Sequence, residues 1–328
     1  MKTITPKSIT PVRGVATVLA LVLLSIGCAD QDPVGPEAIA PEPGGLAPAI
    51  SNGVLDGNGH PNVGFLAIEL EFDGVVVKLP HCSGFFVGPL LSNPSENVFI
   101  TAAHCLNFLD EVGIAANQLV VTFDADAHID PVACGIICAT SWFRATGFAF
   151  DERYGPPGSS FLGHAGAFDY GAVLLEDVPA GLVPVELPTA GLLDQLAAQG
   201  GLRPHTLFDN VGYGRIPFLK EGPPGRRPPG GGGGSNEGFT DPPGRMFSTS
   251  LFNGLTRDFL KLNQNINVRD GNGGGCFGDS GSPKLIHDTN LAVALTGGGD
   301  PLCRVNAINP RLDTPEAREF YGQFLELP

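Results

Sequence analysis

The sequence is short of basic residues: among its 328 residues, 19 Lys and Arg stand against 34 Asp and Glu, a formal net charge of −15 at pH 7. Because nucleic acids and anionic membrane surfaces attract positive charge, this deficit argues against either as a partner. The sequence also lacks a CxxC pair and an HExxH motif. We therefore expect no zinc site, no other bound metal and no cofactor.

The start of the chain has the pattern of an export signal. Lys2, Lys7 and Arg13 precede an apolar run, residues 15–27, that is too short to cross a membrane. Residues 25–28, Ser-Ile-Gly-Cys, resemble a bacterial lipobox in which Cys28 would be lipidated; an ordinary secretory signal is the alternative. We expect a protein exported to the cell envelope, attached to a membrane only through Cys28, or otherwise secreted.

Two segments are too rich in glycine and proline to bury a core. Residues 29–52 follow the signal and are acidic and proline-rich, which predicts a flexible linker. Residues 221–245 contain an uninterrupted glycine run between prolines, which predicts a disordered insertion. The folded domain is expected over residues 53–328.

The remaining segments favour β-structure. Short runs rich in β-branched and aromatic residues, separated by turn residues, predict strands throughout residues 65–176 and 182–308. Near the end, Thr314 can cap a helix that Pro315 starts. The apolar residues that follow fall on one helical stripe, namely Ala317, Phe320, Tyr321, Phe324 and Leu325. We expect a helix over residues 314–326.

One glycine-rich stretch, GGCFGDSGSP at residues 274–283, places Ser280 where a regular element cannot form. Such a turn exposes a hydroxyl and leaves backbone N–H groups free, as a nucleophile requires; a plain surface turn is the alternative. A serine nucleophile also needs a histidine base and a carboxylate that orients it. Candidates are His104 in VFITAAHC and Asp169 in AFDYGAVLLE.

Three motifs in this order, TAAHC (101–105), the Asp169 segment and GDSG (278–281), resemble the chymotrypsin/trypsin family of serine proteases, bacterial branch. VGYG (211–214) resembles a further signature of that family. The resemblance implies two antiparallel six-stranded β-barrels, at about 53–180 and 181–313, with the C-terminal helix packed on the second. It implies a serine endopeptidase that acts on polypeptides, which we expect to be a monomer. A binding module without turnover and an esterase are the alternatives.

The resemblance also implies roles for individual residues. His104, Asp169 and Ser280 would be catalytic, and the N–H groups of Gly278 and Ser280 would form the oxyanion hole. Gly274, six residues before Ser280, would be the base of the specificity pocket, with Gly297 and Gly298 in its wall. Because Gly274 carries no charge, we expect poor cleavage after Lys or Arg and preferred cleavage after Leu, Phe, Tyr or Met.

Seven cysteines are an odd number, and lipidation of Cys28 would leave six for three disulfides. The resemblance pairs Cys82 with Cys105 and Cys276 with Cys303, which leaves Cys134 with Cys138.

In many relatives, the residue at Asp279 is buried and pairs with a new N-terminal amine after cleavage. No basic cleavage site precedes Ile50 or Gly53 here. Because an unpaired buried carboxylate is costly, we expect an internal donor to replace the amine.

Overall fold

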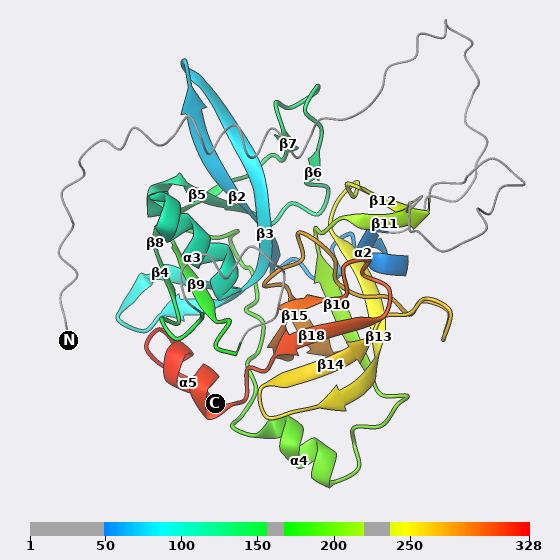
Figure 1. Ribbon diagram of the computed structural model, residues 1–328. Coiled ribbons are helices and arrows are strands. Elements are labelled where there is room, and N and C mark those ends of the chain that lie inside the picture. Colours follow the sequence, from blue (N-terminus) through cyan, green and yellow to red (C-terminus); the bar gives the residue numbers. More distant parts are fainter. Residues whose placement is uncertain (1–48, 156–166, 220–236) are drawn as a thin grey trace, which may run out of the picture. The chain divides into compact units, whose positions relative to one another are not determined.

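The computed structural model describes residues 49–155, 167–219 and 237–328 (Figure 1). The predicted signal and most of the linker fall within residues 1–48, and most of the predicted insertion falls within 220–236, outside the described residues. The described chain is built mainly of antiparallel strands, which confirms the all-β prediction. In the described ranges, no helix has both the length and the apolar composition needed to span a membrane.

The first barrel is closed by six antiparallel strands in the order β2-β3-β4-β9-β8-β5. Their bounds are Val63–Phe72 (β2), Val75–Leu90 (β3), Asn93–Thr101 (β4), Leu119–Thr122 (β5), Phe143–Phe150 (β8) and Gly171–Leu175 (β9). Between them lie α3 (Ala103–Val112), the 3₁₀ turn η1 (Ala116–Gln118) and a small hairpin of β6 (His128–Ile129) and β7 (Ile137–Cys138). Neither helix was predicted from the sequence.

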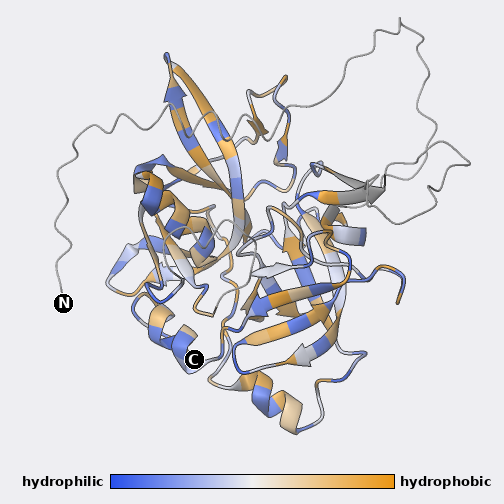
Figure 2. Cartoon of the chain, viewed as in Figure 1, coloured by the Kyte–Doolittle hydropathy of each residue, from blue (hydrophilic) through white to orange (hydrophobic). Residues whose placement is uncertain are grey.

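The second half of the chain forms one sheet in the order β16-β15-β10-β13-β14-β18-β17, with β1 beside β13. The strands are β1 (Val54–Leu55), β10 (Leu207–Gly212), β13 (Met246–Leu255), β14 (Phe259–Asn263), β15 (Pro283–Ile286), β16 (Ala292–Leu295), β17 (Gly298–Gly299) and β18 (Asn306–Pro310). This sheet thus has eight strands rather than the expected six, because the two-residue strands β1 and β17 join six longer ones. A bridge between Ala294 and Arg311 brings β16 against the end of β18. Figure 2 shows apolar and polar residues alternating along its strands, as at β14.

The first barrel contacts the second half of the chain through the outer face of β2. Side chains of a strand point alternately to its two faces, so Leu66 lies in the core of the first barrel while its neighbour Phe65 faces outward. The Phe65 ring stacks on that of Tyr213, which follows β10, with ring centroids 5.1 Å apart. Both faces of β2 are therefore buried.

The segment before the first barrel belongs to the second sheet. Ile50, in the irregular turn α2 (Ala49–Asn52), is fully buried against Ile216 and Met246. The Ser51 N–H donates to the carbonyl of Gly274 at 3.0 Å. The predicted linker over residues 29–52 therefore does not hold for its last residues, because they have both an apolar pocket and backbone partners.

The end of the predicted insertion is also ordered. Residues 237–240 form β12 (Glu237–Thr240), which pairs with β11 (Ile216–Leu219). Arg245 is fully buried, and its guanidinium forms an ion pair with Asp56 at 2.8 Å and donates to the carbonyls of Val63 and Phe123. A glycine-rich and proline-rich composition did not predict this buried arginine.

The C-terminal helix α5 (Pro315–Tyr321) is shorter than the predicted helix, and its aromatic residues pack on Tyr170 of the first barrel, while Glu316 forms an ion pair with Arg257 of the second sheet. Thr314 caps it as expected, because its Oγ1 accepts a hydrogen bond from the Ala317 N–H. Its apolar stripe meets Tyr170, just before β9: the Tyr170 ring lies 5.8 Å from that of Tyr321. The prediction missed the contact with the first barrel, because the stripe specifies an apolar contact and not which part of the chain supplies it.

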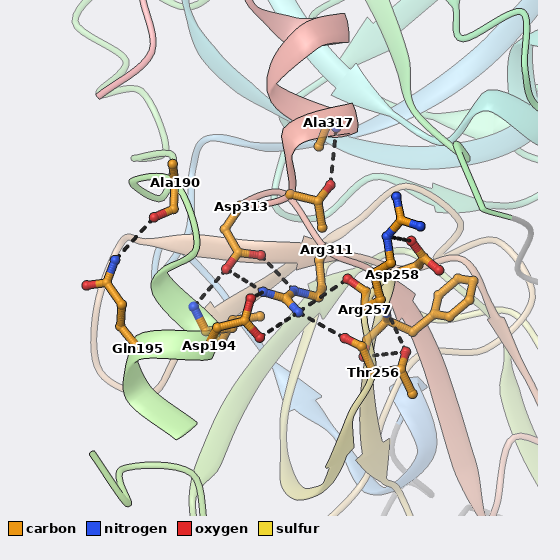
Figure 3. Close-up of polar contacts among 12 residues, drawn as sticks. Ala190, Asp194, Gln195, Thr256, Arg257, Asp258, Arg311, Asp313 and Ala317 are labelled. Carbon is orange, nitrogen blue, oxygen red and sulfur yellow. Dashed lines mark hydrogen bonds and ion pairs between the residues drawn. The ribbon is translucent and has the colours of Figure 1, made fainter. Parts of the chain in front are cut away.

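A buried arginine connects α4 (Leu192–Ala198) to the chain between β18 and α5 (Figure 3). Arg311 is 2% exposed, and its guanidinium forms ion pairs with Asp313 and Asp194, each at 2.8 Å. It also donates to the Thr256 carbonyl at 2.9 Å. Because the charge of Arg311 is matched by carboxylates on both sides, the arginine can be buried without a large penalty.

Candidate active site

His104 lies in the first turn of α3, directly after β4. The first N–H groups of a helix have no acceptor within the helix, and the His104 N–H donates instead to Oδ1 of Asp169 at 2.9 Å. The His104 ring contacts the same carboxylate, with Nδ1 2.9 Å from Asp169 Oδ2. Because a carboxylate accepts, Nδ1 carries the hydrogen and Nε2 is free to act as a base.

Asp169 is fully buried just before β9. Burial of the His104 ring disfavours its protonation, but the charge of Asp169 and the hydrogen bond to it outweigh this effect and raise the pKa of His104. The Tyr154 ring lies on the histidine, with ring centroids 6.4 Å apart. Its own burial and the Asp169 charge raise the pKa of Tyr154, so it stays neutral. Tyr154 has no motif that could have identified it from the sequence.

Ser280 lies in a turn that presses against the first barrel. Gly281 has φ +82, and a Cβ there would lie 2.3 Å from Thr101 Oγ1, 2.6 Å from the Ala102 nitrogen and 2.7 Å from the Ser83 carbonyl. Real Cβ atoms do not approach other atoms so closely, so this position requires glycine. The contact brings the serine turn against the TAAHC segment that carries His104.

Ser83, on β3, fixes the turn from the other side. Its N–H donates to the Ser280 carbonyl at 3.0 Å, and its Oγ donates to the Gly278 carbonyl at 2.9 Å. Within the described ranges, nothing accepts a hydrogen bond from the N–H of Gly278 or Ser280. The turn thus has two carbonyls fixed by Ser83 and two N–H groups without an acceptor among the described residues.

Asp279, beside the serine, is fully buried and accepts hydrogen bonds from the N–H groups of Gly214 and Cys276, each at 2.8 Å. A Cβ at Gly212 or Gly214 would lie within 2.3 Å of its carboxylate oxygens, which explains the two glycines of VGYG. Burial dominates and raises the pKa of Asp279, although the two hydrogen bonds and the charge of Lys284 oppose the rise. Backbone N–H groups therefore serve as the internal donors that we expected.

A pocket of about 320 Å³ lies beside the serine, and both His104 and Ser280 line it. The predicted wall residues Gly297 and Gly298 line it too, but Gly274, the predicted base, is not among the described lining residues. The side chain of Gln264 takes that place, because a Cβ on Gly274 would lie 2.3 Å from Gln264 Oε1. A polar amide thus stands where the sequence predicted an uncharged, open floor.

Three disulfides are present, and each joins the two cysteines paired in the sequence analysis: Cys82–Cys105, Cys134–Cys138 and Cys276–Cys303. The first links β3 to α3 next to His104. The third borders the pocket, since both of its cysteines line it. His81, next to the first disulfide, donates from Nε2 to the Cys105 carbonyl at 2.6 Å, and burial lowers the pKa of His81 to about 4.

Outside this site, the side chains of Asp209, His287 and Asp288 lie close enough to share a metal ion. Their atoms are already used within the group: His287 Nδ1 lies 2.7 Å from Asp209 Oδ1, and the Asp288 N–H donates to Asp209 Oδ2. This cluster includes none of the residues around Ser280.

No family model and no curated protein match the sequence. Solved structures do superimpose on it. They include HL collagenase (TM-score 0.49, 15% identity, 80% of this chain and 92% of that one) and the Vibrio cholerae VesB protease (TM-score 0.49, 14%, 83% and 66%). Human heparin binding protein is also similar (TM-score 0.46, 12%, 81% and 91%). At these TM-scores the similarity assigns no activity, so the functional argument depends on the residues of the site.

Proposed function

We propose that this chain is a serine endopeptidase that hydrolyses peptide bonds through Ser280, His104 and Asp169. One observation carries the proposal: a histidine whose ring is held by a buried carboxylate lines the same pocket as a serine on a glycine-rich turn. These are the parts of a serine nucleophile with its base and orienting group.

In the first half of the reaction, Ser280 Oγ bonds to the carbonyl carbon of the substrate while His104 Nε2 takes the hydroxyl proton. Asp169 stabilises the imidazolium, and the N–H groups of Gly278 and Ser280 bind the negative oxygen. His104 then gives its proton to the leaving amine as the C–N bond breaks, which leaves an acyl group on Ser280.

In the second half, water takes the place of the amine. His104 removes a proton from the water as its oxygen bonds to the acyl carbon, and returns that proton to Ser280 Oγ as the acyl bond breaks. The products are a carboxylic acid and the original enzyme, so no cofactor is consumed.

The chain's export is part of the proposal. Three disulfides are typical of proteins that fold outside a reducing cytoplasm. We further propose lipidation at Cys28, which lies outside the described residues, and a monomeric enzyme that acts on polypeptides.

The test is reaction with an organophosphorus serine probe, read by mass spectrometry of the labelled peptide, together with hydrolysis of a mixed peptide library. We expect label on Ser280, loss of label in Ser280→Ala, and a fall in peptidase kcat on the order of 10⁶-fold in Ser280→Ala or His104→Ala. Unchanged thermal unfolding of both variants is the control for folding. If the probe labels Ser280 and the chain hydrolyses esters but not peptides, the esterase is favoured. If the probe does not label the chain, the binding module is favoured.

A further inference from the structure

Three buried polar atoms in or behind the lining of the pocket have no hydrogen-bond partner among the described residues. They are Oε1 and Nε2 of Gln264, which is 1% exposed, and Nζ of Lys284, which is fully buried. A buried polar group without a partner costs on the order of 1–3 kcal/mol, so three of them in one place indicate that something else satisfies them. A ligand that enters the pocket can do so.

Lys284 lies on β15, on the chain that follows Ser280. A Cβ on Gly275, which lines the pocket, would lie 3.3 Å from Lys284 Nζ and 3.2 Å from Thr296 Cγ2. Lys284 does not itself line the pocket: its Nζ lies behind Gly275, where the same Cβ would also be 3.5 Å from Asp279 Cβ. Gln264 lines the pocket next to it.

Lys284, Asp279 and Asp300 are the charged groups that bear on whether the pocket takes an acidic side chain. Burial lowers the pKa of Lys284, while the charge of Asp279 opposes this and favours the protonated ammonium. Asp279 uses its carboxylate oxygens on two backbone N–H groups. Asp300, which lines the pocket, directs its oxygens to the N–H groups of Leu302 and Val305 and to others of the same loop. Both carboxylates therefore direct their oxygens to backbone N–H groups and not to a cationic substrate side chain in the pocket.

We propose that this pocket binds the acidic side chain of a substrate glutamate or aspartate, with Lys284 as the specificity-determining residue and Gln264 as a second hydrogen-bond donor. The inference depends on the proposed function, because it places that side chain directly before the peptide bond that Ser280 attacks. This acidic preference replaces the preference for apolar substrate residues that was expected from Gly274. A site with buried polar groups discriminates strongly against substrates that leave those groups unpaired.

The first experiment measures kcat/KM for peptides that are identical except for Glu, Asp, Gln, Leu, Phe or Arg before the scissile bond. We expect Glu or Asp to exceed Leu and Phe by at least about tenfold, a factor that one buried charged contact readily supplies. Lys284→Met should abolish this ratio through a fall in kcat/KM for the Glu and Asp peptides. Lys261→Met removes a lysine of the same sheet, outside the pocket, and should leave the ratio unchanged.

A second measurement works without turnover. Calorimetry on the Ser280→Ala variant compares product-like peptides that end in Glu, Gln or Leu, and we expect the Glu peptide to bind at least about tenfold tighter, with the advantage lost in Ser280→Ala/Lys284→Met. Because it needs no catalysis, this measurement tests the pocket even if Ser280 proves unreactive, so failure of the pocket and failure of the enzyme are distinguishable.

Three results would overturn the inference. A preference of the native chain for Leu or Phe would restore the apolar pocket. An equal fall for every peptide in Lys284→Met would make Lys284 only a counter-charge for Asp279. Equal binding of the Glu and Gln peptides would show that the substrate side chain is recognised by hydrogen bonds to the Gln264 amide and not by the charge of Lys284. If Lys284→Met does not fold, two measurements still test the inference. They are the peptide preference of the native chain and the calorimetric comparison of the Glu, Gln and Leu peptides in a Gln264→Leu variant.

Discussion

Replacing Gly281 by alanine tests whether the serine turn really needs its close contact with the first barrel. The residue has φ +82, and an added Cβ would lie 2.3 Å from Thr101 Oγ1 and 2.6 Å from the Ala102 nitrogen. Gly271 is a matched control, because its φ is +74 but nothing lies within 4 Å of an added Cβ. The two variants share the cost of the backbone conformation and differ only in the clash.

The expected magnitudes follow from these two contributions. The left-handed conformation costs alanine about 1–2 kcal/mol in either variant. Overpacking adds about 1–3 kcal/mol at Gly281 alone, since the atoms it meets are mostly backbone and cannot move aside. Gly281→Ala should therefore lower the free energy of unfolding by about 2–5 kcal/mol, against about 1–2 kcal/mol for Gly271→Ala.

Denaturant unfolding with the disulfides intact measures the stability difference, and peptide hydrolysis measures the effect on the site. A displacement of Ser280 by about 1 Å should cost on the order of 100-fold in rate, whereas Gly271→Ala should stay active. Equal stabilities of the two variants, or full activity of Gly281→Ala, would refute the argument that this contact positions the serine.

Three further predictions concern other parts of the chain. Arg311→Met should lower the free energy of unfolding by about 3–5 kcal/mol, because it leaves the buried carboxylate of Asp313 without its cationic partner. Arg257→Met, at a side chain 77% exposed, should cost less than about 1 kcal/mol; equal losses in denaturant unfolding would contradict this. Asp169→Asn should lower kcat by about 10⁴-fold. It should also move the acidic limb of the pH–rate profile to lower pH, because activity rises as His104 loses its proton and Asp169 raises the pKa of that group; an unmoved limb would contradict the assignment. Intact-mass spectrometry of the exported chain should find a diacylglyceryl group on Cys28 and no free thiol on the other cysteines, and a mature chain that begins after Cys28 would count against the lipobox.

Local motifs in the sequence were enough to propose most of the site. GDSG and TAAHC each combine a reactive residue with the small residues that its close surroundings require, so the pattern is visible within a few positions. The glycines of VGYG have the same origin: the carboxylate of Asp279 leaves no room for a side chain at Gly212 or Gly214. The all-β fold could also be predicted, because alternation along a strand depends only on neighbouring residues.

The tertiary structure decided what depends on residues far apart in the chain. The apolar stripe of α5 predicted burial, but only the position of Tyr170 shows that the first barrel supplies the partner. Arg245 ends a glycine-rich and proline-rich segment, and its burial depends on Asp56 and on carbonyls of the first barrel.

The floor of the pocket is the clearest case. In the sequence, Lys284 is one lysine at the start of a short strand and Gln264 follows another, with nothing to connect them to the glycines before Ser280. Folding places Gln264 where a side chain on Gly274 would stand and Lys284 Nζ beside Gly275. The charge of a pocket is the sum of the groups that the fold brings together. The glycine at its expected base therefore indicated only that space is available there, and the side chains of the surrounding strands determined the chemistry.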